Sequence, residues 1–382
     1  MSLRPVAHQL QLPPADPAPH ASSQAYCLRY EERTVQAERI VSPETVNAPV
    51  NAYAAMSVGR ALEPYQFTPK ELSTLDVEVV ISHCGMCHTD IHLINDDFGM
   101  SAFPLVPGHE IVGVVSQMGN GVRHLQVGQR VGIGPMGGAC FLCEQCTAGR
   151  EHLCPQAQYI PFGIPGGYAT HIRVDSRVAF PVPDAIPSEY AAPLLCAGVT
   201  VFAPLRRHVN ATTRLGVIGI GGLGHLALQY GRAMGCHVTA FSSSAEKAEE
   251  AQQFGADEFV ATTEEGALAA RAGTCDFLLS TVTADLPWAD YLNVLKPEGT
   301  LCVLGIPETD IRLPAIPLLF GQRKVIGSLI GSGPETKAML EFSARHQIWP
   351  KIEQYPMREA NAALDRLSKN QVRYRVVLAN EA

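Results

Sequence analysis

Short apolar runs separated by glycine and proline mark the first half of the chain, from about Tyr53 to Pro183. The runs alternate or continue over four to nine residues, which is typical of β-strands rather than helices. The most regular of them read DVEVVIS, IVGVVSQMG, RVGIG and YATHIRV. This pattern predicts a compact antiparallel β domain.

The pattern changes after about Thr213, where short apolar strands alternate with helical periodicity. The strands read LGVIGI, HVTAF, FLLSTV, TLCVLG and KVIGSLI. Between the first two, apolar residues recur at the helical spacing i, i+3, i+4 and i+7, at Leu223, Leu226, Ala227 and Tyr230. Alternating strands and helices predict a parallel sheet covered on both faces. Two further helices, near 334–346 and 357–370, and a strand near 373–379 follow.

Residues 1–50 differ from both regions, because prolines interrupt them repeatedly and no periodicity persists. We interpret this segment as a partly ordered extension. A targeting arm is one alternative, although Glu31, Glu32 and Glu38 interrupt the basic character of a mitochondrial transit peptide. Packing across a subunit boundary is another.

Composition narrows the classes of function. A length of 382 residues predicts two domains, and 46% hydrophobic with 17% charged residues is typical of a globular protein. The formal net charge of −8 argues against nucleic-acid binding. Pro193 and Pro204 cut the longest apolar stretch, 191–205, and no secretory signal is evident, so we expect neither a membrane span nor export. The expected location is cytoplasmic.

The eleven cysteines form an odd number, which fits poorly with a disulfide framework in a chain of this length. Four of them stand in a C-x2-C-x2-C-x7-C array, and four thiolates can close a tetrahedral shell around a structural zinc ion. Unliganded buried thiols are an alternative. An iron–sulfur cluster is another, but the spacing matches neither common ferredoxin pattern. The array consists of Cys140, Cys143, Cys146 and Cys154.

A second candidate metal site combines three separated motifs: HCGMCHTDIH at 83–92, PGHE at 107–110 and PLLCAG around Cys196. Cys87, His109 and Cys196 would supply two sulfurs and one nitrogen and leave a fourth position open, as catalytic zinc sites do. Taken alone, CGMC also fits a redox pair. Glu110 could ligate the metal transiently or orient a ligand, and Asp90 could fix the imidazole tautomer of the ligand histidine.

An open zinc ion polarises a carbonyl as a Lewis acid and stabilises the charge that develops when hydride arrives. Thr89 and His92 are suited to carry the proton, with the hydroxyl first and the imidazole towards solvent. Without the neighbouring cysteine, these two residues would read as a turn-capping hydroxyl and a surface histidine. We interpret Cys84 as a packed thiol.

The run LGVIGIGGLGHLALQYG contains G-x-G-x-x-G between a buried strand and a helix, which is typical of dinucleotide binding. Its glycines are Gly219, Gly221 and Gly224. The next strand ends without the acidic residue that binds the ribose of NAD and has Ser242, Ser243, Ser244 and then Lys247 instead. Hydroxyls and an ammonium can bind a 2′-phosphate, so NADP is favoured, although the serines can also cap the following helix.

With these motifs, the chain resembles zinc-dependent medium-chain alcohol dehydrogenases, and within them the cinnamyl alcohol dehydrogenase type and bacterial NADP-dependent aldehyde reductases. The resemblance covers about residues 53–380 and rests on GMCHTDIH, VPGHEIVGVV, the four-cysteine loop, PLLCAGVT, GIGGLG, FSSS, GSLIGSGPETKAML and VRYRVVL. A Cys2His shell is a known catalytic ligand set of alcohol dehydrogenases. The loop PQAQYIPFGIP is shorter than is typical of these reductases, which weakens inference about the substrate.

The resemblance implies an α/β fold in which a GroES-like β-rich catalytic domain, 51–197 and 331–382, is split around a Rossmann NADP-binding domain, 198–330. It implies two zinc ions per chain, NADP, a small aldehyde or primary alcohol of aromatic, allylic or medium-chain type, and a homodimer. A non-catalytic NADP- and zinc-binding sensor or structural protein is the alternative. The implied catalytic zinc positions are Cys87, His109, Glu110 and Cys196, with Thr89 and His92 as the proton relay, and the implied coenzyme contacts are Thr200, Gly219, Gly221, Gly222, Leu223, Gly224, Ser242, Ser243, Ser244, Lys247, Val303, Gly305 and Arg375.

Overall fold

The computed structural model describes residues 48–307 and 309–380, so the extension predicted at 1–50 lies almost wholly outside the described residues. The predicted antiparallel β region is confirmed, and its strands form a sheet in the order β16-β17-β3-β4-β5-β9, with β8 also paired to β3. Only the β16–β17 pair in this sheet is parallel. The strands are β3 (Asp76–Met86), β4 (Glu110–Met118), β5 (Arg130–Ile133), β8 (His171–Asp175), β9 (Ala179–Pro181), β16 (Ile352–Pro356) and β17 (Arg375–Ala379).

Strand β3 is the centre of this sheet, because its eleven residues pair with two neighbouring strands along one edge. Its first half pairs with β8 and its second half with β17, while β4 runs along the other edge. Apolar residues of β3 such as Val77, Val79 and Ile81 are buried and belong to one hydrophobic core. Two further antiparallel pairs complete the region, β1 (Val50–Ala55) with β2 (Leu62–Phe67) and β6 (Met136–Gly138) with β7 (Gln158–Tyr159).

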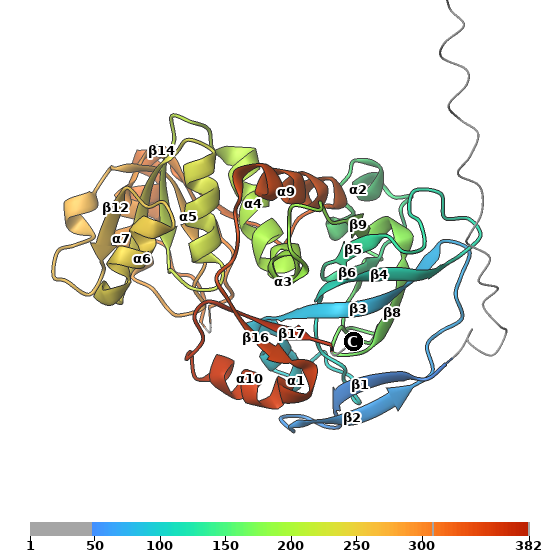
Figure 1. Cartoon of the computed structure of the whole chain (residues 1–382). Coiled ribbons are helices and arrows are strands. Elements are labelled where there is room, and N and C mark those ends of the chain that lie inside the picture. Colours follow the sequence, from blue (N-terminus) through green and yellow to red (C-terminus); the bar gives the residue numbers. More distant parts are fainter. Residues whose placement is uncertain (1–47, 308, 381–382) are drawn as a thin grey trace, which may run out of the picture. The chain divides into compact units, whose positions relative to one another are not determined.

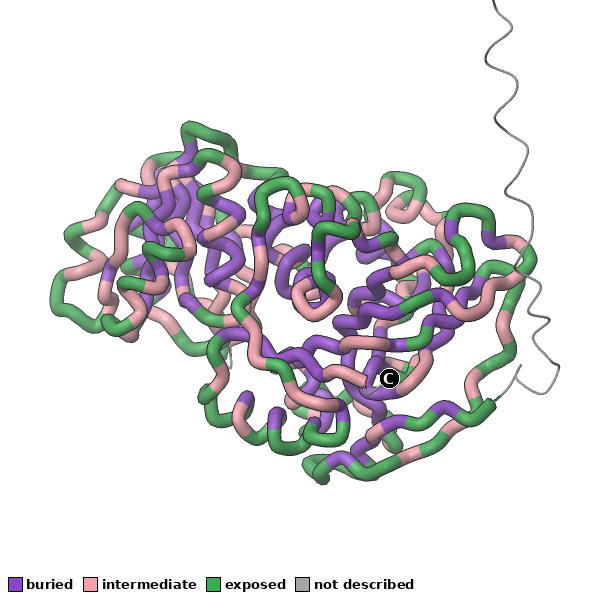
Figure 2. The backbone as a smooth tube through the Cα atoms, in the orientation of Figure 1, coloured by how far each residue is buried: buried purple, intermediate pink, exposed green. Residues whose placement is uncertain are grey.

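The predicted parallel sheet is also confirmed, in the order β12-β11-β10-β13-β14-β15. Its central strands are almost wholly buried, which explains why they read as continuous apolar runs (Figure 2). Sequence reasoning missed β12, whose four residues are short and partly polar. The strands are β10 (Arg214–Ile218), β11 (His237–Ser242), β12 (Glu258–Ala261), β13 (Cys275–Ser280), β14 (Leu295–Val303) and β15 (Lys324–Gly327).

Helices accompany both sheets (Figure 1). In the parallel sheet, α5 contacts β10 and β11, α6 contacts β12, and α7 and α8 contact β14. The helices predicted at 334–346 and 357–370 are α9 and, after a 3-10 turn, α10. The described helices are α1 (His88–Ile94), α2 (Glu144–Thr147), α3 (Ser188–Pro193), α4 (Val199–His208), α5 (Gly224–Ala233), α6 (Ala248–Gln253), α7 (Trp288–Val294), α8 (Ala315–Gly321), α9 (Gly333–His346) and α10 (Ala360–Ser368), with short 3-10 turns at η2 (Glu151–Leu153), η3 (Ser176–Val178), η5 (Ala245–Lys247), η6 (Ala269–Arg271) and η7 (Met357–Glu359).

The apolar stretch around 191–205 forms one helical run, and the expectation that its prolines interrupt it was wrong. Helices α3 and α4 join through a π-helical turn, η4 (Leu194–Gly198), and the helix continues past Pro193 and Pro204. The run Ser188–His208 has the length and hydropathy of a membrane span, but 72% of its apolar window is buried inside the protein. Within this run, α3 contacts β3 and β4, and α4 contacts α5. Its apolar surface is therefore covered, as in a core helix.

The start of α9 is fixed by a charged capping arrangement that ties it to α4. Ser332 and Glu335 form a reciprocal capping box, and Arg207 donates two hydrogen bonds to the Glu335 carboxylate, each of 2.7 Å. Burial by itself raises the pKa of Glu335, but the hydrogen bonds from Arg207 and Ser332 outweigh it and hold the pKa below the usual 4.5. The charged form of Glu335 is therefore the stabilising one.

Replacing Glu335 with Gln should lower the free energy of unfolding by about 1–2 kcal/mol at neutral pH, because the charge-assisted bonds to Arg207 are weakened while the cap is kept. A lowered pKa gives stability that is present above the unfolded pKa and lost as the pH falls through the folded one. The difference in the free energy of unfolding between wild type and variant, measured by urea unfolding, should therefore become smaller below about pH 4.5. A difference that is unchanged down to pH 3.5 would contradict the assigned charge.

Candidate active site

Cys87 stands at the N-cap of α1, at the end of β3, and its position is fixed by Asp90. The Cys87 backbone N–H donates to Asp90 Oδ2 over 2.9 Å. Asp90 is fully buried, and its Oδ1 accepts the Gly108 N–H at 3.0 Å and lies 3.1 Å from His109 Nδ1. One buried carboxylate therefore holds both the β3–α1 turn and the loop before β4, and it leaves His109 Nε2 free to bind a ligand.

The donor atoms of Cys87, His109, Glu110 and Cys196 all lie within 4.8 Å of one another. Three far separated segments thus meet at one point: the start of α1, the start of β4 and the π-helical turn η4. Helical turns of this kind are frequent at functional sites. Close packing demands glycine at residue 85, because a Cβ atom there would lie 2.0 Å from Glu110 Oε2.

Glu110 connects this donor group to β17. Its Oε1 accepts a hydrogen bond from Arg375 Nη2, and both side chains are buried. Its Oε2 is buried and has no hydrogen-bond partner among the described residues. Burial raises the pKa of Glu110 to about 7, although Arg375 opposes the shift. An unsatisfied buried carboxylate oxygen beside two thiols and an imidazole is a donor set that suits a divalent cation.

The charges of the donor group point the same way. A hydrogen bond from the Cys196 thiol, supported by His109, holds the pKa of Cys87 well below its usual value in spite of burial. Burial opposes the charged form of His109, but Asp90 and Cys87 outweigh it and raise the pKa of His109. Without a metal ion, the Cys87 thiolate is therefore balanced by a protonated His109, and a cation bound between them would displace the His109 proton.

Thr89 and His92 lie on one side of α1, as their spacing of three residues requires. The Thr89 hydroxyl is 3.6 Å from Cys87 Sγ, and His92 is partly exposed, with 37% of its side chain accessible. Sequence reasoning missed Asp97, whose Oδ2 lies 2.7 Å from His92 Nδ1. No sequence motif signalled this contact, because the turn after α1 brings the two residues together.

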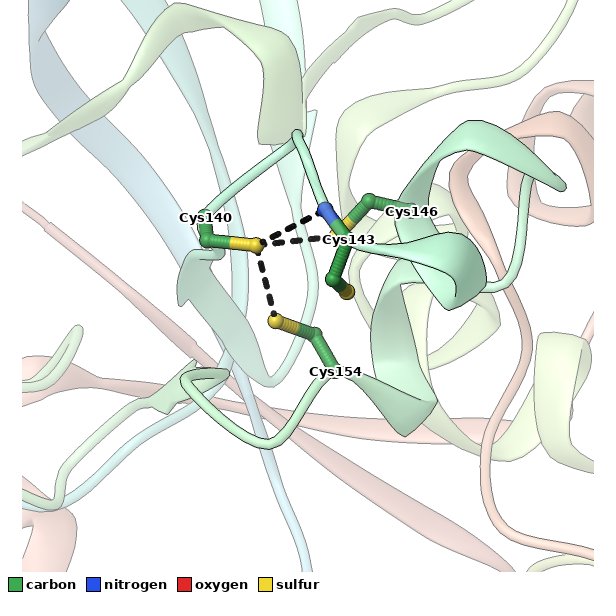
Figure 3. A group of neighbouring side chains, drawn as sticks. All are labelled: Cys140, Cys143, Cys146 and Cys154. Atoms are coloured by element: carbon green, nitrogen blue, oxygen red, sulfur yellow. Dashed lines mark hydrogen bonds between the residues drawn. The ribbon is translucent and has the colours of Figure 1, made fainter.

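The four cysteines of the predicted structural zinc site converge (Figure 3). Their ligand atoms lie within 4.8 Å of one another, and Cys140 Sγ is 3.5 Å from Cys154 Sγ and 3.8 Å from Cys146 Sγ. Backbone N–H groups of Leu142 and Cys143 lower the pKa of Cys140 to about 6, which favours the thiolate that a metal binds. These features fit a closed tetrathiolate site.

The predicted dinucleotide loop lies between β10 and α5, as its motif requires. Gly224 must be glycine, since a Cβ atom there would lie 1.8 Å from the Gly219 carbonyl oxygen. Sequence reasoning missed Thr281, whose hydroxyl donates to the Ile218 and Gly219 carbonyls over 3.0 Å. Arg375 also reaches this loop, because its Nη1 would be 3.0 Å from a Cβ atom at Gly222. Arg375 thus lies between the glycine loop and Glu110.

The other predicted coenzyme residues surround this loop in part. Ser242 is buried at the end of β11 and accepts the Ser244 N–H over 3.2 Å, whereas Ser243 is exposed. Lys247 Nζ donates to the Ile220 carbonyl over 2.9 Å. Val303 ends β14, and Gly305 lies against the Val282 carbonyl. Thr200 lies one helical turn beyond Cys196, so both face the same side of the run.

Two protein-family models match the chain: "Alcohol dehydrogenase GroES-like domain" over residues 73–184 and "Zinc-binding dehydrogenase" over 222–345. Among curated proteins, a probable cinnamyl alcohol dehydrogenase of Arabidopsis thaliana is 42% identical over 348 residues, which cover 88% of this chain and 97% of the relative. The chain belongs to the zinc-binding alcohol dehydrogenase family. An aldehyde reductase of Synechocystis is 40% identical over 332 residues, 87% of this chain and 99% of that protein.

Solved structures support the same family. A cinnamyl alcohol dehydrogenase from Sorghum bicolor has a TM-score of 0.83 and 37% identity, covering 87% of this chain and 98% of its own. CAD from Helicobacter pylori, complexed with NADP(H), has a TM-score of 0.80 and 30% identity over the same shares. The predicted GroES-like and Rossmann architecture of an alcohol dehydrogenase is confirmed, and an oxidoreductase is favoured over the non-catalytic alternative.

Proposed function

We propose that this alcohol dehydrogenase exchanges a hydride between NADP(H) and a zinc-associated aldehyde or primary alcohol, of aromatic, allylic or medium-chain type. The observation that supports it most is the largely buried donor group of Cys87, His109, Glu110 and Cys196, beside which Thr89 can deliver a proton. The names of the relatives, cinnamyl alcohol dehydrogenase and aldehyde reductase, support the substrate class. The cytoplasm stays our expected location.

Cys87, His109 and Cys196 would hold the catalytic zinc ion, and Glu110 would lie beside them as a transient ligand. When bound, zinc supplies a Lewis acid for the carbonyl and NADPH supplies the hydride. In aldehyde reduction, His92 would take up a proton from solvent and Thr89 would pass it to the substrate oxygen; in alcohol oxidation the proton would move the opposite way. Asp97 would orient the His92 ring through the Nδ1 contact. Asp90 fixes the His109 tautomer, so that Nε2 keeps its lone pair for the metal.

The second zinc ion of our proposal would bind Cys140, Cys143, Cys146 and Cys154. Its lobe has few buried residues of its own, so the metal would replace a hydrophobic core. NADP is supported by the end of β11, where the exposed Ser243 and the ammonium of Lys247 stand in place of an acidic residue. Arg375 would meet the pyrophosphate at Gly222.

The function is tested by following NADPH oxidation with a panel of aromatic, allylic and aliphatic aldehydes, before and after treatment with a chelator and with NADH in parallel. We expect turnover that falls on chelation and returns with added zinc. The absence of turnover with every aldehyde, in protein carrying two zinc ions, would refute the enzymatic proposal. Equal use of NADH would refute the coenzyme assignment alone.

A homodimer is supported by an exposed apolar patch on α8, beside the edge of the parallel sheet. Strand β15 is the edge of that sheet, and nearby α8 exposes three large apolar side chains. Exposed fractions reach 88% at Phe320, 72% at Leu319 and 70% at Ile316. An open strand edge beside such a patch suits an isologous contact with a second copy.

Replacing Phe320 with Glu should convert the dimer into a monomer, because the two-fold symmetry buries the new charge twice without a partner. Light scattering after gel filtration would measure the mass. Replacing Leu142, which is 85% exposed on the cysteine lobe, with Glu is the matched control and should leave the mass unchanged. A Phe320→Glu protein that stays dimeric would show that the subunits meet elsewhere.

A further inference from the structure

Glu250, on α6, is held by three groups from the segments before β16 and β17. Lys351 Nζ donates to its Oε1 over 2.8 Å, and the Tyr374 hydroxyl donates to its Oε2 over 2.7 Å. Arg373 Nη2 is 3.2 Å from the same Oε2, and only 15% of the Glu250 side chain is exposed. We call Glu250, Lys351, Arg373 and Tyr374 the Glu250 latch. It occupies both carboxylate oxygens of Glu250.

Lys247 lies directly beside this latch. It precedes Glu250 by three residues, a spacing at which opposite charges on a helix normally pair. Here Lys247 Nζ instead donates to the Ile220 carbonyl, and among the described residues it forms no ion pair with Glu250. The ammonium groups of Lys247 and Lys351 lie 6.0 Å and 5.9 Å from the centre of the Tyr374 ring. The carboxylate is therefore directed to Lys351.

This division of partners matters for a phosphate. Without Lys351, Oε1 of Glu250 would be free to pair with Lys247 while Tyr374 and Arg373 still hold Oε2, and the charge of the carboxylate would repel a 2′-phosphate bound at Lys247. We propose that the Glu250 latch determines coenzyme specificity by keeping Lys247 available to the 2′-phosphate of NADP. Lys351 and Tyr374 are thus positioning residues that act through Glu250. This inference rests on the proposed NADP site.

The latch also adjoins the glycine loop through His225, which limits the variants that can be used. The His225 ring stacks on Tyr374 with centroids 4.8 Å apart, its Nδ1 bonds the Gly221 carbonyl, and its Nε2 accepts the Lys351 backbone N–H. Burial lowers the pKa of His225 to about 3, so this neutral tautomer persists. A change confined to the Lys351 side chain keeps the backbone bond, and Tyr374→Phe keeps the stacked ring.

The test titrates the full chain with NADPH and with NADH and follows coenzyme fluorescence, a measurement that does not depend on turnover. Lys351→Gln should raise the dissociation constant for NADPH roughly fivefold or more, as coupled sites commonly do, and change that for NADH by less than about twofold. The double variant Glu250→Gln with Lys351→Gln should restore tight NADPH binding, because the competing carboxylate is gone. Tyr374→Phe should act in the same direction as Lys351→Gln.

Two matched controls remove equivalent groups elsewhere. Lys369→Gln breaks an exposed ion pair with Asp365, and Tyr355→Phe removes a tyrosine-to-glutamate hydrogen bond to Glu353; neither should change NADPH binding.

A double variant that binds NADPH as weakly as Lys351→Gln alone would overturn the proposal, since Lys351 would then act on the phosphate directly. Equal weakening of NADH would overturn it too. A wild type without preference for NADPH would instead refute the coenzyme assignment, whereas a preference unaffected by Lys351→Gln would refute the latch only.

Discussion

Replacing Cys196 with Ala should remove one of the two proposed zinc ions and lower kcat/KM for aldehyde reduction by about a thousandfold. The side chain supplies one of the two sulfurs of the buried donor group. Lewis-acid assistance of this kind is worth several kcal/mol, and about 1.4 kcal/mol corresponds to a factor of ten in rate. Metal content by mass spectrometry and initial rates, both measured on the purified protein, would check the two effects together.

Cys84→Ala is the matched control for that experiment. Cys84 is fully buried three residues before Cys87, and its thiol contacts the Gly85 carbonyl at 3.5 Å. It is not part of the donor group. The variant should keep both zinc ions and most of the activity, with a modest loss of stability from the lost packing. If Cys196→Ala retained both metal ions or normal activity, the catalytic site would have to be placed elsewhere.

Replacing Ser243 with Asp should reverse the coenzyme preference. The new carboxylate would face the 2′-phosphate of NADPH at the end of β11, where Ser243 is exposed and free of other hydrogen bonds within the described residues. Repulsion between like charges costs several kcal/mol, so kcat/KM for NADPH should fall about a hundredfold. The value for NADH should rise, because a carboxylate at this strand end can accept the ribose 2′-hydroxyl. Steady-state kinetics with both coenzymes would measure the change.

NADH serves as the internal control in this experiment. A variant damaged in folding or in the glycine loop would lose activity with both coenzymes, since the loop between β10 and α5 is common to them. Loss of activity with both coenzymes would therefore say nothing about charge. Ser243→Ala resolves that case, because it should weaken the binding of NADPH only modestly. Unchanged NADPH kinetics in Ser243→Asp would show that the phosphate binds away from β11.

The local patterns of the sequence predicted both sheets. Continuous apolar runs identified β10, β11, β13 and β14, because strands that are largely buried admit few polar residues. A similar run identified β15, although this edge strand is mostly exposed. The same logic failed for β12, which is short and only partly buried. Local reasoning also failed for the helical run through Pro193 and Pro204, most of which is buried inside the protein, and this burial outweighs the local cost of proline.

The sequence by itself determined the candidate chemistry of this protein: four closely spaced thiols, a second set of candidate metal ligands in three motifs, and a glycine loop followed by serines and a lysine. Ligand spacing and loop glycines are local properties, so they can be recognised from the sequence alone. Only the tertiary structure decided which groups hold these residues in place. Asp97 beside His92, Arg375 between Glu110 and the glycine loop, and Lys351 on Glu250 are contacts made when distant or irregular segments pack together. Such contacts depend on three-dimensional packing, which leaves no fixed spacing in the sequence.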